Sequence, residues 1–178
     1  MRKVLYIFGQ LNDSDVRWLA QAGKRRTFAN GDVLVHEGRD IGTLLFVLDG
    51  ELAVTVDGTA VASLGVGEVV GEMSFVDTAP PSATVTAVSD GTVLEIDKKT
   101  LVAKTDETPA FGMRFYKALS IFLADRLRGT TLRIGYGEAQ ELTSDEIMAD
   151  ELDENVLDGV SLAGERFDRM LREMRGLG

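Results

Sequence analysis

The 178-residue chain contains no cysteine and a single histidine, His36. The lack of cysteine excludes disulfides, thiol nucleophiles and thiolate metal sites. One histidine cannot supply the two or three imidazoles of a cupin-type metal site, and no Cys-His or metalloprotease set can be assembled around it. Carboxylates are plentiful, but their spacing singles out no catalytic pair. We therefore expect no catalytic residues, no metal site and no enzymatic activity.

Long apolar runs are also missing. The longest, residues 4–8 and 44–48, fall far short of the roughly 18 residues that a membrane span needs. The N-terminal stretch has no apolar region followed by a small-residue cleavage site, so it does not resemble a secretory signal. We expect a cytoplasmic protein without a membrane span.

Positive charge is nearly absent from the middle of the chain. Residues 30–97 hold twelve carboxylates and one cation, Arg39, so this segment has a net charge of −11, against −10 for the whole chain. Such a segment repels nucleic acid, because protein affinity for nucleic acid depends on neutralising phosphates with Lys and Arg.

The same middle segment has the pattern of a compact antiparallel β-structure. Short stretches rich in Val, Leu, Ile and Thr are separated by Asn-Gly, Glu-Gly and Asp-Gly turn signals. The predicted strands are VLVHE, LLFVL, ELAVTV, TAVASL and TVLEI. Many short strands at this spacing predict a barrel or jelly roll. Before them, residues 13–23 predict a helix that begins at Asn12 or Ser14 and stops at Gly23.

A long helix is predicted after the strands, with Thr108 as its cap and Pro109 in its first turn. Apolar residues recur along it at spacings of three and four, at Phe111, Phe115, Leu119 and Phe122. This stripe packs on the barrel, or part of it forms a homodimer interface, and the two are compatible. Met113, Tyr116, Ile121 and Leu127 widen the apolar surface beyond one face, so we expect a homodimer.

The C-terminal part divides in two. Residues 134–165 contain ten carboxylates and no Lys or Arg, which predicts an acidic linker over about residues 129–160. Residues 161–176 then predict a short amphipathic helix whose apolar face is Phe167, Met170, Leu171 and Met174. This helix either docks on its own domain or binds a groove of an unidentified protein partner.

Three stretches carry a resemblance to a known family: FANGDVLVHEG, LLFVLDGELAV and, above all, GEMSFVDTAPPSATV at residues 71–85. They resemble the cyclic nucleotide-binding domain superfamily of catabolite activators and protein kinase A regulatory subunits, over about residues 10–128. A fainter resemblance, in MRKVLYIFGQLNDSD and PPSATV, is to cyclic nucleotide-binding-like proteins associated with bacteriocin-type transport.

The resemblance implies an α+β fold. A β jelly-roll barrel at 27–97 is flanked by the N-terminal helix at 13–23 and by closing helices at 98–128, which end in the long C-terminal helix. This domain spans residues 1–128, and the acidic tail and short terminal helix follow it. The family's transcription factors add a winged helix-turn-helix of some 70 residues, and too few residues follow Arg128 for one. We therefore expect a stand-alone module without a DNA-binding domain.

The stretch GEMSFVDTAPPSATV resembles the family's phosphate-binding cassette. The resemblance implies that a short helix opens at Gly71 and Glu72, and that Glu72 accepts a hydrogen bond from a ribose 2′-hydroxyl. It also implies that the phosphate is bound by backbone N–H groups near Met73 and Ser74 and lined by Ser82 and Ala83. The family's phosphate-binding arginine falls at Pro81 in this chain.

Proline at this position removes a charge-assisted hydrogen bond, which contributes about 1.5–3 kcal/mol. Counting the cost of an unpaired phosphate as well, affinity should fall roughly 10²- to 10³-fold. The nearby basic residues, Arg39 and His36 in its protonated form, lie in a hairpin that the family does not turn toward the phosphate. We expect a regulatory or scaffolding module with no cofactor and no tight binding of cAMP or cGMP. The alternative is a sensor that binds a cyclic nucleotide or another small ligand through Glu72 and backbone N–H groups.

Overall fold

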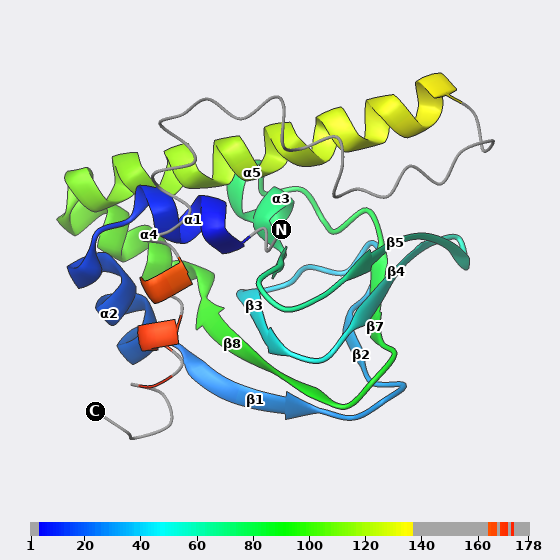
Figure 1. Cartoon of the computed structure of the whole chain (residues 1–178), viewed down its shortest axis with the longest axis horizontal. Coiled ribbons are helices and arrows are strands. Elements are labelled where there is room, and N and C mark those ends of the chain that lie inside the picture. The colour runs from blue at the N-terminus through cyan, green and yellow to red at the C-terminus, as the bar shows by residue number, and fades with distance from the viewer. Residues whose placement is uncertain (1–3, 137–163, 167, 171, 173–178) are drawn as a thin grey trace.

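The computed structural model describes residues 4–136, 164–166, 168–170 and 172 (Figure 1). The elements of residues 4–136 follow in this order: α1 (Val4–Gln10), α2 (Asp13–Ala22), β1 (Lys24–Phe28), β2 (Val33–Val35), β3 (Thr43–Asp49), β4 (Leu52–Val56), β5 (Thr59–Leu64), β6 (Val69–Val70), α3 (Glu72–Val76), β7 (Thr84–Ala87), β8 (Gly91–Asp97), α4 (Lys98–Glu107) and α5 (Pro109–Tyr136).

The strands form two four-stranded antiparallel sheets, in the orders β1-β8-β3-β6 and β2-β7-β4-β5. Their inner faces enclose a core of aliphatic residues and one phenylalanine, which includes Phe28, Val35, Leu45, Val47, Leu52, Val85 and Val93. The predicted α+β fold with a jelly-roll-like barrel is confirmed.

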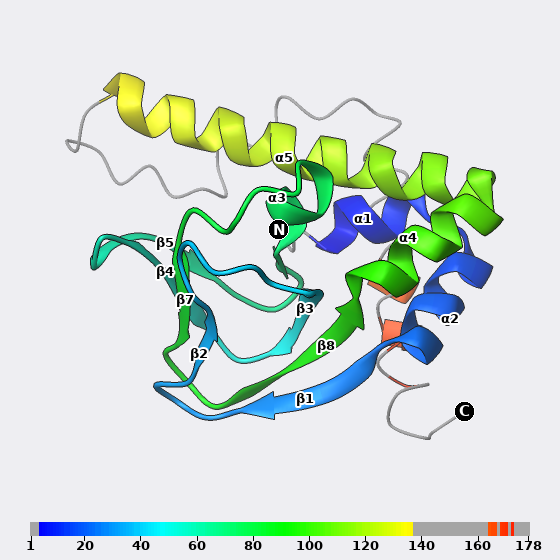
Figure 2. The ribbon, with the colours of Figure 1, turned by 180° about the vertical axis from the view of Figure 1, so that it is seen from behind.

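A second core lies where the helices gather on one end of the barrel (Figures 1 and 2). Strand β3 serves both cores because successive side chains of a strand point to opposite faces. Leu44 and Phe46 pack under the helices, whereas Leu45 and Val47 face the other sheet. This is why residues 44–48 read as an unbroken apolar run, without the alternation of a strand that has one wet face.

Local signals placed the boundaries of α2 correctly. The Asn12 side chain accepts a hydrogen bond from the Asp15 N–H, and the Asp15 carboxylate accepts one from the Asn12 N–H, so the two residues form a capping box. Gly23 follows the helix, and its N–H donates to the Leu19 carbonyl.

The predicted limits of several other elements differ from the structure. The long helix does not end near Arg128 but runs to Tyr136, so residues 129–136 are helical instead of part of a linker. Gly129 has no left-handed backbone that would end the helix. The Thr130 and Thr131 hydroxyls donate to carbonyls one turn earlier within it.

Two elements were missed at the N-terminal side. Helix α1 was not predicted, although Ile7 and Phe8 are fully buried and α1 packs on α5. Strand β1 begins at Lys24, three residues before the predicted barrel. Its Lys24, Arg25 and Arg26 are exposed on an edge strand, so they lack the apolar alternation on which the strand prediction relied.

The C-terminal region is only partly described. Residues 137–163 lie outside the described residues, and with them most of the predicted acidic linker. Residues 164–166, 168–170 and 172 are helical, within the predicted terminal helix at 161–176.

Candidate ligand-binding site

The cassette begins with a tight turn at Gly71, between β6 and α3. Gly71 has φ of 88°, and a Cβ there would lie 2.9 Å from the Thr43 carbonyl oxygen. Only glycine combines this left-handed backbone with so close an approach. Helix α3 then opens at Glu72, where the resemblance places the start of the cassette helix.

Glu72 is the most buried charged side chain of the cassette, with 2% of its surface exposed. Burial raises the pKa of this carboxyl above its usual range, and neighbouring Glu68 adds to the effect, although the charge of Arg126 acts in the opposite direction. Next to it on α3, the Met73 side chain is half exposed and Ser74 is partly buried.

The phosphate end of the cassette has no cation from its own loop. Pro81 and Ala83 are partly buried and Ser82 is exposed. Among the described residues, no Lys or Arg side chain forms a hydrogen bond or ion pair with residues 77–84.

The first hairpin lies closer to this end than the family resemblance implied. The Gly38 N–H donates to the Pro81 carbonyl oxygen at 2.8 Å, and the Glu37 N–H donates to the Thr84 hydroxyl at 3.1 Å. The backbone of exposed Arg39 is therefore anchored beside position 81.

A side chain from α5 binds the residue that the family resemblance assigns to ribose binding. The Arg126 Nη1 donates to the Glu72 Oε1, and its Nη2 donates to the Val69 carbonyl oxygen at 3.2 Å and to the Glu68 Oε2 at 3.4 Å. The guanidinium also lies 4.6 Å from the centre of the Phe122 ring. The oxygen that the family resemblance assigns to a ribose hydroxyl is thus bound to an arginine of the same chain.

A second cation near the cassette is Lys98, at the start of α4. Burial lowers its pKa, while the carboxylates of Glu72, Asp40 and Asp77 raise it. Neither Lys98 nor Arg126 was predicted as part of the site, because both lie after the predicted barrel at residues 27–97.

The sequence does contain a signal for Arg126. The buried stripe of α5 runs through Phe115, Leu119 and Phe122 at spacings of four and three, and the next step of four reaches Arg126. A charged residue at a core position of a helix usually has a buried partner.

The four stripe residues proposed for dimerisation lie in the core of their own chain. Phe111, Phe115, Leu119 and Phe122 have no exposed surface, and Phe115 packs edge-on against Phe75 of α3 at 5.7 Å. Within residues 109–131 of α5, the exposed large apolar side chains are instead Met113, Tyr116 and Leu127.

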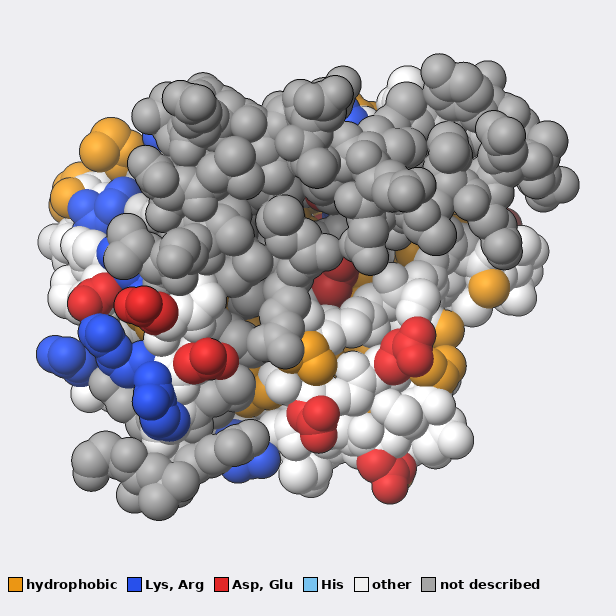
Figure 3. Space-filling view, in the orientation of Figure 1, with side chains coloured by type: hydrophobic (Ala, Val, Ile, Leu, Met, Phe, Trp, Pro, Cys, Tyr) orange, Lys and Arg blue, Asp and Glu red, His pale blue; other side chains and the backbone are white. Residues whose placement is uncertain are grey.

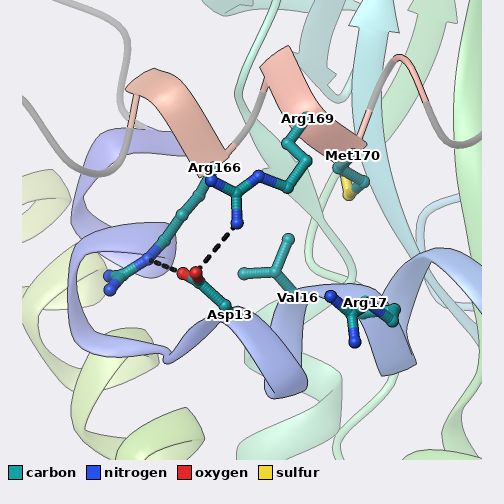
Figure 4. Close-up of a pocket in the computed structure, with 6 residues that line it drawn as sticks. All are labelled: Asp13, Val16, Arg17, Arg166, Arg169 and Met170. Carbon is teal, nitrogen blue, oxygen red and sulfur yellow. Dashed lines mark hydrogen bonds and ion pairs between the residues drawn. The ribbon is translucent and has the colours of Figure 1, made fainter. Parts of the chain in front are cut away.

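The C-terminal segment lies against α2 (Figure 4). Arg166 and Arg169 both donate to the Asp13 carboxylate, and Arg166 also donates to the Phe8 carbonyl oxygen. Met170 is fully buried in the core under the helices, and a small pocket remains between this segment and α2. Phe167, Leu171 and Met174, the other residues of the predicted partner-binding face, lie outside the described residues.

On the face of the molecule that Figure 3 shows, the distribution of charged side chains follows the charge pattern of the sequence. In Figure 3 the charged side chains over the barrel end are acidic, and the basic ones gather toward the helical end.

Within the described part of the chain, no group of three or more His, Cys, Asp or Glu is placed to hold a metal ion. None of the described helices is long and apolar enough to cross a membrane.

Known proteins share the fold described above. The cyclic nucleotide-binding domain family matches residues 25–107. A cyclic nucleotide-binding domain from Methylobacillus flagellatus is 25% identical and superposes with a TM-score of 0.70 over 79% of this chain and 85% of that one. The chain therefore contains a domain that is similar to the cyclic nucleotide-binding domain family.

Two further comparisons show how far the likeness extends. The Pycsar effector protein PaPycTIR of Pseudomonas aeruginosa is 32% identical over 117 residues, which are 65% of this chain and 37% of that protein. The catabolite activator protein of Thermus thermophilus shares the fold, at 23% identity and a TM-score of 0.60 over 96% of this chain and 87% of that one.

The chain corresponds to only part of its curated relatives, since it spans between 10% and 37% of the length of the first ones it matches. The family match itself ends at residue 107, at the last residue of α4. Arg126, which binds Glu72, therefore lies outside the segment that the cyclic nucleotide-binding domain family matches.

Proposed function

We propose that this chain is a regulatory or scaffolding module that uses the cyclic nucleotide-binding fold without binding cAMP or cGMP tightly, and that it is not an enzyme. The observation that carries the proposal is Pro81, which stands where the family resemblance places the phosphate-binding arginine. Proline has neither a side-chain charge nor a backbone N–H, so it cannot donate to a phosphate oxygen.

The electrostatics of the cassette support this proposal. A cyclic phosphate would approach Glu72 and Glu68 with no arginine from the loop to offset their charge, in a segment whose net charge is −11. Pro80 and Pro81 also restrict the backbone of the loop, so the cassette keeps its shape without a ligand to order it.

The test is calorimetric titration of the full chain with cAMP and cGMP, for the wild type and for Pro81→Arg. We expect no submillimolar binding by the wild type. We expect Pro81→Arg to bind roughly 10²- to 10³-fold more tightly, because the new guanidinium pairs with the phosphate.

The matched control is Pro80→Arg, which makes the same chemical change one residue earlier, at an exposed position. We expect this variant to bind like the wild type. Submillimolar binding by the wild type, or equal gains from both variants, would contradict the proposal.

A second candidate function is that of a sensor that binds a cyclic nucleotide or another small ligand through Glu72 and cassette N–H groups. The bond between the Gly38 N–H and the Pro81 carbonyl favours it, because this bond holds Arg39 beside the phosphate end. If the wild type binds a cyclic nucleotide, Arg39→Gln should weaken that binding about tenfold or more.

A further inference from the structure

The two sheets have four edge strands, β1, β2, β5 and β6, and they differ in how well they are protected. Strand β1 carries three cations, Lys24, Arg25 and Arg26, while β2 and β6 are only three and two residues long. Charge and brevity protect an edge, because its unpaired N–H and C=O groups otherwise pair with another chain. Strand β5 has six residues, TASVAL in composition, with neither charge nor proline, so it has neither protection.

The outer side of β5 is open along most of its length. Within the described part of the chain, β5 pairs with β4 alone. Four of its six residues are exposed, namely Thr59, Ala60, Val61 and Ser63. The hairpin of β4 and β5 lies at the end of the molecule opposite α2 (Figures 1 and 2). An added strand therefore reaches β5 without displacing a described element.

The β5 edge is bent at Val61. Ala60 and Ala62 oppose Thr55 and Val54 of β4, so Val61 is the extra residue of a bulge, and it is 46% exposed. A bulge bends a strand and strengthens its twist, which makes the edge poorly suited to open-ended stacking of flat sheets. The edge is instead suited to one short strand, with Val61 as an apolar contact.

Carboxylates lie at both ends of β5. At one end, the Ser63 hydroxyl donates to the Glu51 Oε1 at 2.6 Å. At the other end, Asp57 occupies the turn before β5, and its N–H donates to the Glu37 Oε2 at 3.3 Å. Residues 40–97 contain no Lys or Arg that would offset these charges.

This charge pattern selects among the strands that β5 can accept. In an antiparallel pair of two β5 strands, the Glu51 end of one copy lies beside the Asp57 end of the other. Like charges at both ends disfavour this pairing, whereas a strand with a cation at each end gains two favourable contacts.

We propose that β5 is a docking edge for an extended segment of a partner protein that has Lys or Arg at each end and small or β-branched residues between them. The segment adds to β5 through main-chain hydrogen bonds, and its cations pair with Glu51 and Asp57. This edge is separate from the cassette, so it goes beyond the proposed function and gives the scaffolding module a partner of stated chemistry.

The first test uses the peptide KTVTVTVK, capped at both ends, in an NMR titration of the full chain. We expect a Kd of about 0.1–1 mM at low ionic strength, amide shifts centred on β5, and weaker binding as salt is added. Absence of binding, or shifts that lie away from β5 and its flanking turns, would overturn the proposal.

Two altered peptides separate main-chain pairing from charge. The same peptide with N-methyl groups on its six internal residues keeps both charges but loses the N–H donors, so we expect it to bind about tenfold or more weakly. The peptide ETVTVTVE keeps the donors but reverses the charges, and we expect no measurable binding. Equal binding by either one would contradict strand addition to an acidic edge.

Two protein variants locate the contact. Val61→Lys places a cation on the edge and should weaken binding of KTVTVTVK about tenfold or more. The matched control is Val33→Lys, which adds the same charge at another exposed valine, on β2 at the opposite edge of the same sheet. We expect the control to bind within about twofold of the wild type. Equal losses from both variants would show a general charge effect and overturn the docking edge.

Light scattering of Val61→Lys and calorimetry with cAMP and cGMP complete the test. We expect both measurements to match those of the wild type, because the change lies outside the cassette. A smaller assembly than the wild type would show that β5 pairs two copies of this chain, and would overturn the cationic partner. Failure at β5 leaves the proposed function intact, since that function depends on nucleotide binding by the wild type and by Pro81→Arg.

Discussion

Glu72 combines deep burial with a cation that comes from a distant part of the chain. The removal of water raises its pKa, and the Arg126 charge lowers it, with burial the larger effect. The pair is separated by 54 residues, so it forms only when α5 lies over α3. Its ion pair is therefore better suited to specify the position of α5 than to add much net stability.

The raised pKa gives a prediction for the dependence of stability on pH. A folded-state pKa above 4.5 means that the stability linked to protonation of Glu72 is fully present below 4.5 and is lost as pH rises through the raised value. We expect the wild type to gain stability relative to Glu72→Gln as pH is lowered from 7 to about 5.

Urea denaturation of both proteins at the two pH values measures this difference. The charges of Glu68 and Arg126 shift the pKa of Glu72, and Glu72 in turn shifts the pKa of Lys98. All three residues remain in the variant, so the comparison isolates the effect of removing the Glu72 carboxyl. If the stability of the wild type relative to Glu72→Gln stays constant or falls as pH is lowered, burial does not dominate the pKa of Glu72.

At the scale of elements, α5 has a buried apolar face and a second apolar face that is more exposed. Its inner face carries the buried stripe, while Met113, Tyr116, Leu123 and Leu127 follow one another on the outer face at spacings of three, seven and four. These positions fit a heptad repeat with Ser120 between them, which is typical of a seam between two helices. We propose that the outer face of α5 binds the same face of a second copy.

Light scattering of the full chain tests this homodimer. We expect the wild type to be a dimer, and we expect Met113→Glu combined with Leu127→Glu to be a monomer, because the change buries like charges at the seam. Arg128→Glu, an exposed change away from the seam, should leave the dimer intact. A monomeric wild type, or a dimeric double variant, would contradict the proposal.

At the scale of the whole molecule, the C-terminal segment returns to α2 and contributes to the core under the helices. Its ion pairs are weak stabilisers, since Asp13 is about half exposed and such pairs contribute about 0–1 kcal/mol each. Met170 is fully buried, which contributes about 1.5–3 kcal/mol. The apolar contact should therefore dominate the docking.

Two substitutions compare these contributions. We expect Met170→Ala to lower the free energy of unfolding by about 2–5 kcal/mol and Asp13→Asn to lower it by less than about 1 kcal/mol. Urea denaturation measures both values, because urea is uncharged and does not screen the ion pairs. A cost for Asp13→Asn equal to or above that for Met170→Ala would show that the ion pairs hold the segment.

The sequence by itself determined the features that depend on neighbouring residues. Asn12 and Gly23 mark the two ends of α2, where each takes part in a hydrogen bond within one turn. Most of the barrel strands could be predicted from short apolar stretches between turn signals. The cassette could be recognised from its own residues, and Pro81 lacks a charge and an N–H in any surrounding. These properties are local, so one stretch of sequence carries them.

The tertiary structure decided which distant residues meet. Helix α1 forms where α5 buries Ile7 and Phe8, and the Met170 contact depends on how a remote segment packs against the helical core. Glu72 contacts Arg126 only because burial of the stripe fixes the rotation of α5 about its axis. In this rotation Arg126, four residues after Phe122, faces α3. The partner of Glu72 is therefore set by helix packing, which the sequence of the cassette alone does not contain.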